Sequence, residues 1–132
     1  MRKIVTAGMA AAFLMMFGFS NFSAALAHDA NMPGMENGRD VVIKGELVDS
    51  LCYVAMAGKG SGHKQCAMDC AKAGIPVSIV EEGTGKLYTV LPKEDKTGYP
   101  ASVISKMGDK VTLKGDLYET GGNKYVTVES VE

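Results

Sequence analysis

The chain has little of what most enzymes and nucleic-acid-binding proteins depend on. Its 132 residues include no tryptophan, two histidines and three cysteines. The sequence has no Gly-x-Ser-x-Gly, no glycine-rich phosphate loop and no Cys-x-x-Cys. Basic residues do not outnumber acidic ones, and the formal net charge is −1, which gives a nucleic-acid backbone little attraction. These absences disfavour an enzyme and a nucleic-acid partner.

The N-terminal segment predicts export from the cytoplasm. Two basic residues are followed by an apolar run at 7–19 and by the small-residue sequence Ala-Leu-Ala at 25–27. This order is typical of a secretory signal peptide, with cleavage before His28. A membrane anchor is the alternative, but the run is shorter than the roughly 20 apolar residues that a span needs. We therefore expect a signal peptide at 1–27 and a periplasmic or secreted protein without a stable membrane anchor.

Removal of this segment leaves 105 residues, enough for one compact domain. All four phenylalanines lie in the signal peptide, so the aromatic residues of the remaining chain are five tyrosines. Twelve basic and fifteen acidic residues remain, a formal charge of about −3. The mature protein is thus expected to be a small, mildly acidic domain.

The pattern after residue 40 is mainly that of short strands. Residues 28–40 contain proline, glycine and asparagine without an apolar period and predict a flexible leader. The domain is expected at 41–132, beginning with a strand over 41–51 in which Gly45 would mark a bulge or sharp bend. The other expected elements are strands at 77–80, 86–91, 110–118 and 124–131, and short helices at 64–73 and 100–107.

This order predicts a mainly β fold, a five-stranded OB-like barrel. Five strands with a helix between the third and the fourth is the OB-fold order. The segment 52–74 would then be a helix-containing insertion between the first two strands. An open β-meander is the alternative architecture.

The strongest functional signal is a group of four potential metal ligands within nineteen residues: Cys52, His63, Cys66 and Cys70. On a helix of about 3.6 residues per turn, positions 63, 66 and 70 fall on one stripe. Cys52 is expected at the end of the first strand, close enough to join them. Three thiolates and one imidazole suit Zn²⁺ or Cu(I) and match a closed tetrahedral site. We therefore expect a non-enzymatic metal-binding module for zinc or copper.

The sequence does not choose between these two metals. Zinc would connect the insertion to the barrel and stabilise the fold. Copper is indicated by Met56 and Met68 near the cysteines and by the leader residues 28–35, which contain His28 and two more methionines. The nearby acids Glu46, Asp49 and Asp69 are expected on a solvated face.

A disulfide is the main alternative to a metal. Exported thiols tend to oxidise, and Cys52 could pair with Cys66 or Cys70, or the latter two with each other. An odd number of cysteines would leave one thiol over. The protein would then be a disulfide-stapled OB-fold ligand-binding domain or a thiol–disulfide redox protein.

The stretches Gly45–Tyr53 and His63–Val77 carry a resemblance to a known group of proteins. With their Cys-Tyr and His-x-x-Cys-x-x-x-Cys motifs, they resemble small exported bacterial proteins of OB-like build. The resemblance implies a periplasmic domain with a Cys/His cluster, leaves open a periplasmic protein partner, and brings no established activity with it.

Overall fold

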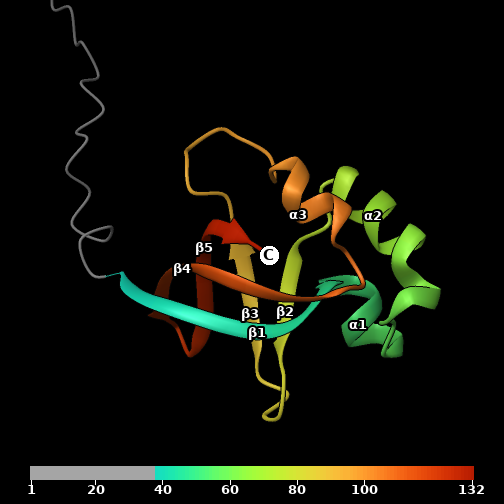
Figure 1. Cartoon of the computed structure of the whole chain (residues 1–132), viewed down its shortest axis with the longest axis horizontal. Helices are drawn as coiled ribbons and strands as arrows, with labels where there is room; N and C mark the ends of the chain where they lie inside the picture. The colour runs from blue at the N-terminus through green and yellow to red at the C-terminus, as the bar shows by residue number, and fades with distance from the viewer. Residues whose placement is uncertain (1–37) are drawn as a thin grey trace, which may run out of the picture. The chain divides into compact units, whose positions relative to one another are not determined.

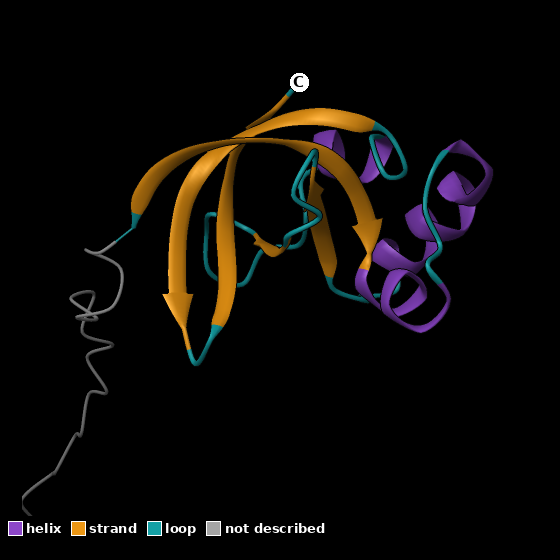
Figure 2. Ribbon diagram, turned by 90° about the horizontal axis from the view of Figure 1, so that it is seen from below, coloured by secondary structure: helices purple, strands orange, loops and turns teal. Residues whose placement is uncertain are grey.

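Five strands close into a barrel in residues 38–132, the part of the chain that this computed structural model describes (Figures 1 and 2). The strands are β1 Arg39–Asp49, β2 Val77–Glu81, β3 Leu87–Leu91, β4 Lys110–Thr120 and β5 Asn123–Val131. Their order around the barrel is β1-β2-β3-β5-β4, and β4 pairs with β1 to close it. Neighbours are antiparallel except for β3 and β5, which are parallel. The predicted OB-like barrel is confirmed.

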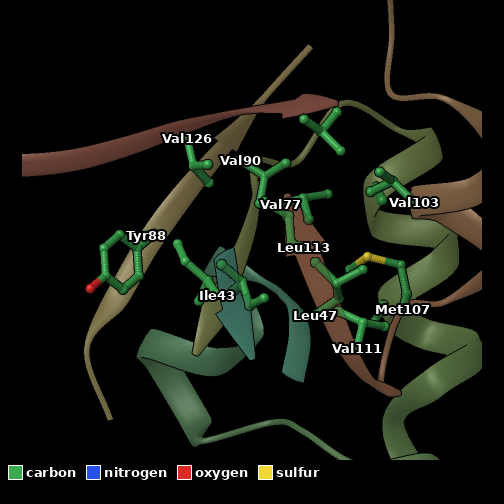
Figure 3. Close-up of a cluster of buried hydrophobic side chains, with 14 of the residues drawn as sticks. Ile43, Leu47, Val77, Tyr88, Val90, Val103, Met107, Val111, Leu113 and Val126 are labelled. Atoms are coloured by element: carbon green, nitrogen blue, oxygen red, sulfur yellow. The ribbon is translucent and has the colours of Figure 1, made fainter. Parts of the chain in front are cut away.

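The barrel interior is filled by alternate strand residues, because successive side chains of a strand point to opposite faces. Leu47, Ile79 and Leu113 are among the side chains that are fully enclosed. Each side chain of this kind stabilises the fold by about 1.5–3 kcal/mol relative to exposure. Val103 and Met107 join the cluster from outside the strands, and Figure 3 shows Met107 beside Leu47 and Val111.

The helices gather at one end of the barrel (Figure 2). They are α1 Ser50–Met56, the 3-10 turn η1 Ser61–His63, α2 Lys64–Lys72 and α3 Ala101–Ser105. The first three form the predicted insertion between β1 and β2, and α3 lies between β3 and β4 as expected. Ala67 and Ala71 of α2 are buried in the same core as the strands, so the insertion is packed on the barrel.

The boundary between β1 and the insertion differs from the prediction. β1 begins at Arg39, inside the expected leader, and ends at Asp49 rather than at residue 51. The carboxylate of Asp49 accepts a hydrogen bond from the backbone N–H of Cys52 and so caps a helix. Cys52 therefore lies in the first turn of α1, and the expectation of a loop directly after it was wrong.

Of the bulge or sharp bend predicted at Gly45, the strand pairing shows no bulge. The pairing of β1 with β4 runs without a shift through Gly45, opposite Val111, and the pairing with β2 begins at Gly45, opposite Glu81. A Cβ at Gly45 would lie 2.2 Å from the carbonyl oxygen of Val80. Glycine is needed there because the two backbones come so close.

The predicted signal peptide at 1–27 and residues 28–37 of the leader lie outside the described residues. Within residues 38–132, no helix has the length and apolar character needed to cross a membrane.

Candidate metal centre

The three cysteines of the chain come together at the helical end of the barrel. Cys52 lies in α1, and Cys66 and Cys70 lie one turn apart in α2. Their three Sγ atoms all lie within 4.8 Å of one another, and all three thiols are free. Zinc bonded to sulfur at about 2.3 Å would hold two tetrahedral ligands roughly 3.8 Å apart. The three sulfurs are thus close enough to bind one metal ion after a small adjustment.

Packing of α2 against the barrel determines where its cysteines lie. Ala67 and Ala71 are one turn apart and buried, so this row of the helix faces the core. The neighbouring row, Cys66 and Cys70, lies at the rim of that contact, with Cys70 half-buried and Cys66 exposed. The cluster therefore has a protected side and a side open to solvent.

The connection between α1 and α2 is fixed by hydrogen bonds and by a close approach. Ala57 takes a left-handed conformation, with φ of 54°, and the N–H of Gly58 donates to the carbonyl of Cys52. A Cβ at Gly58 would lie 3.0 Å from His63 Nε2 and 3.2 Å from Cys52 Cβ. Glu46 of β1 then accepts a hydrogen bond from the N–H of Gly60. The chain thus closes tightly around two of the predicted ligands.

His63 lies just before the helix whose stripe was predicted to include it. It belongs to η1 and precedes α2, which begins at Lys64. Its Nε2 lies 3.3 Å from Asp49 Oδ2. Ligand atoms of Asp49, Cys52 and His63 form a second group within 4.8 Å. Cys52 belongs to both groups, and the binding of one ion by all four predicted ligands stays a prediction.

Asp49 is the residue of the site that the sequence reasoning missed. It is fully buried, whereas a solvated face was expected. Oδ1 accepts the N–H of Cys52 at 2.8 Å, and Oδ2 faces His63. An aspartate directly before a helical segment is typical of a helix N-cap, and this signal could have placed it. The prediction for Asp69 is confirmed, because its side chain is 62% exposed.

The surroundings of Cys52 and Cys70 raise the pKa of both thiols and so favour their protonated forms. The pKa of Cys52 is raised to about 12, first by its hydrogen bond to the Asp49 carboxylate and then by burial and the negative charge of Asp49. Burial and the charge of Asp49 also raise the pKa of Cys70. A reactive cysteine needs the opposite, a lowered pKa. A bound cation would stabilise the thiolate forms.

The methionines of the insertion lie in different environments. Met68 packs against the hydrophobic core, whereas Met56 is 67% exposed. The methionines and the histidine of the leader lie outside the described residues. Met68 is thus accounted for by packing, which weakens its use as an indication of copper.

Comparison of the chain with protein-family models, with curated proteins and with solved structures finds no match. The resemblance to exported OB-like proteins therefore stays a prediction.

The difference in exposure and pKa predicts an order of thiol labelling. In reduced, metal-free protein, iodoacetamide should modify Cys66 first and Cys52 last, at least tenfold more slowly at pH 8. Cys66 is exposed, and Cys52 is buried with a pKa of about 12. Labelling of Cys52 should continue to accelerate above roughly pH 9.5, where an ordinary thiol is already ionised.

Peptide mass spectrometry at timed quenches measures this order. Labelling in denaturant is the control, since all three thiols should then react at similar rates. Equal rates for Cys52 and Cys66 in the folded protein would contradict the assigned environments.

Proposed function

We propose that the protein is an exported, non-enzymatic metal-binding module for zinc or copper. Its thiolate ligands are Cys52, Cys66 and Cys70, and His63 is the fourth ligand. The observation that carries the proposal is the meeting of three sulfur atoms, from two different helices, within 4.8 Å of one another. Soft and borderline cations are the partners that such a set of ligands prefers.

The electrostatics of the site support a metal more than a cysteine nucleophile. Asp49 lies beside Cys52 and disfavours its thiolate form, as the raised pKa of Cys52, about 12, indicates. Catalysis by a cysteine needs a thiolate near neutral pH. A bound cation would favour the thiolate over the protonated thiol, because it attracts the carboxylate and the thiolates together.

Metal binding would also stabilise the insertion. Cys52 is held by α1, next to β1, while Cys66 and Cys70 belong to α2. One ion bonded to all three sulfurs would link these helices by contacts that the unfolded chain lacks. Its binding free energy would therefore add to the stability of the fold.

A disulfide protein is the second candidate, and the same proximity favours it. Two of the three sulfurs, which lie within 4.8 Å of one another, could move together and form a disulfide bond on oxidation. Cys66 is exposed and therefore accessible to an oxidant. The protein would then be a disulfide-stapled OB-fold domain or a thiol–disulfide redox protein with one thiol left over.

Counting thiols and metal in the same preparation separates the two candidates. Native protein purified without reductant should contain one zinc or copper per chain, and should show three free thiols after chelation and denaturation under anaerobic conditions. Removal of the metal should lower the melting temperature by about 10 °C or more, the effect expected of a ligand present at about 100 times its dissociation constant. One free thiol and no metal would instead establish the disulfide.

Export is the part of the proposal that depends on the sequence alone. Its support is the basic, apolar and small-residue order of residues 1–27. Expression of the full chain in a bacterium should yield periplasmic or secreted protein whose intact mass corresponds to a start at His28. Full-length protein that stays in the cytoplasm would contradict export.

A further inference from the structure

We propose that Asp49 shifts the selectivity of the cluster toward a divalent ion such as Zn²⁺ and away from the monovalent Cu(I). The inference rests on the proposed metal-binding function and goes further, because it names the residue that determines the charge of the preferred ion. Asp49 acts in two ways: its carboxylate adds a buried negative charge to the site, and it positions His63.

The carboxylate is placed to act on an ion in the cluster. Asp49 is 0% exposed, and one of its oxygens belongs to a group within 4.8 Å of ligand atoms of Cys52 and His63. Both oxygens of the carboxylate have a partner: Oδ1 accepts a hydrogen bond from the N–H of Cys52, and Oδ2 faces His63 Nε2 at 3.3 Å. It cannot turn away without losing the cap of α1.

The charge of Asp49 is not neutralised by a permanent cation. Among residues 38–132, no lysine or arginine lies within ion-pair distance of it, and His63 is its one such partner. Lys64, the next residue after His63, pairs with Asp109 at 2.5 Å. The negative charge therefore remains available to a metal ion.

A buried negative charge distinguishes ions by valence. Both Zn²⁺ and Cu(I) would use the same three thiolates, so the free energy of deprotonating the cysteines cancels when the two affinities are compared. The attraction to Asp49 does not cancel, because it is proportional to the charge of the ion. At a separation of about 5 Å, one extra unit of charge changes affinity by a factor of ten or more, even at the effective dielectric constant of a protein interior.

The contact between Asp49 and His63 also favours Zn²⁺ relative to Cu(I). If Nε2–H donates to Asp49 Oδ2, the lone pair remains on Nδ1, and the ring orientation is fixed. Zinc completes its tetrahedron with such a nitrogen, whereas Cu(I) accepts softer, sulfur-only surroundings. Loss of Asp49 should thus weaken zinc binding more than Cu(I) binding.

The test compares the Zn²⁺ and Cu(I) affinities of wild-type protein and Asp49→Asn, by competition with chelators under anaerobic, reducing conditions. Asparagine keeps the size of the side chain and an oxygen that caps α1, but it removes the charge. The ratio of zinc to Cu(I) affinity should fall at least tenfold. Asp69→Asn is the matched control, because it removes the same charge from an exposed position between Cys66 and Cys70, and should change the ratio less than threefold.

The outcomes separate this inference from the function on which it rests. An unchanged ratio in Asp49→Asn, with both ions bound by the wild type, overturns the role of Asp49 and leaves the metal-binding module intact. Equal losses for both ions, together with a lower melting temperature of the metal-free protein, also overturn it, since they show only a structural cap. Binding of neither ion by the wild type contradicts both proposals.

Two further measurements test the inference if Asp49→Asn does not fold. Asp49→Ser removes the charge and keeps a good capping side chain, and the same fall in the ratio is expected. The wild type alone also tests the inference: tight binding of Cu(I) without a measurable zinc site would overturn it.

Discussion

The hydrogen bond from the N–H of Cys52 to the carboxylate of Asp49 connects the barrel to the candidate site. It ends β1, begins α1 and directs the chain away from the barrel wall. A cap of this kind stabilises a helix by about 1 kcal/mol, which matters for a helix as short as Ser50–Met56. Because the cap fixes the first turn of α1, it also helps to hold Cys52 where its sulfur lies within 4.8 Å of both sulfur atoms of α2.

The same carboxylate disfavours further negative charge on the thiols of the metal-free site. Asp49 is buried beside a thiol whose pKa it raises to about 12, and further thiols lie close by. Such a group is stable while its thiols are protonated, and each lost proton adds repulsion. A cation removes that repulsion. One electrostatic cause therefore joins the fold to the proposed function: this end of the barrel encloses a negative charge that no lysine or arginine of residues 38–132 balances.

The barrel could be predicted from the sequence, because strand alternation and turn residues are local signals. The last two strands alternate regularly, and the structure has them at Lys110–Thr120 and Asn123–Val131. The end of β1 could not be predicted in the same way. Leu47 and Leu51 continue the apolar pattern of a strand, but Leu51 is 57% exposed on α1, since the Asp49 cap overrides the alternation.

Part of the candidate site could be predicted from local sequence patterns, and part depends on contacts between residues far apart in the chain. Cys66 and Cys70 could be paired from their spacing, because neighbours four apart on a helix share a face. Asp49 is buried and contacts His63, fourteen positions further along the chain, and no local pattern specifies this contact. The N-cap position of Asp49 could thus have been predicted from the sequence, but the burial of its charge could be identified only from the folded structure.

X-ray absorption at the metal edge of the purified native protein tests the central claim most directly. The account predicts three sulfur neighbours at about 2.3 Å from the ion and one lighter neighbour at about 2.0–2.1 Å. A metal surrounded by nitrogen and oxygen alone, with no sulfur neighbour, would contradict the assignment of Cys52, Cys66 and Cys70 as its ligands.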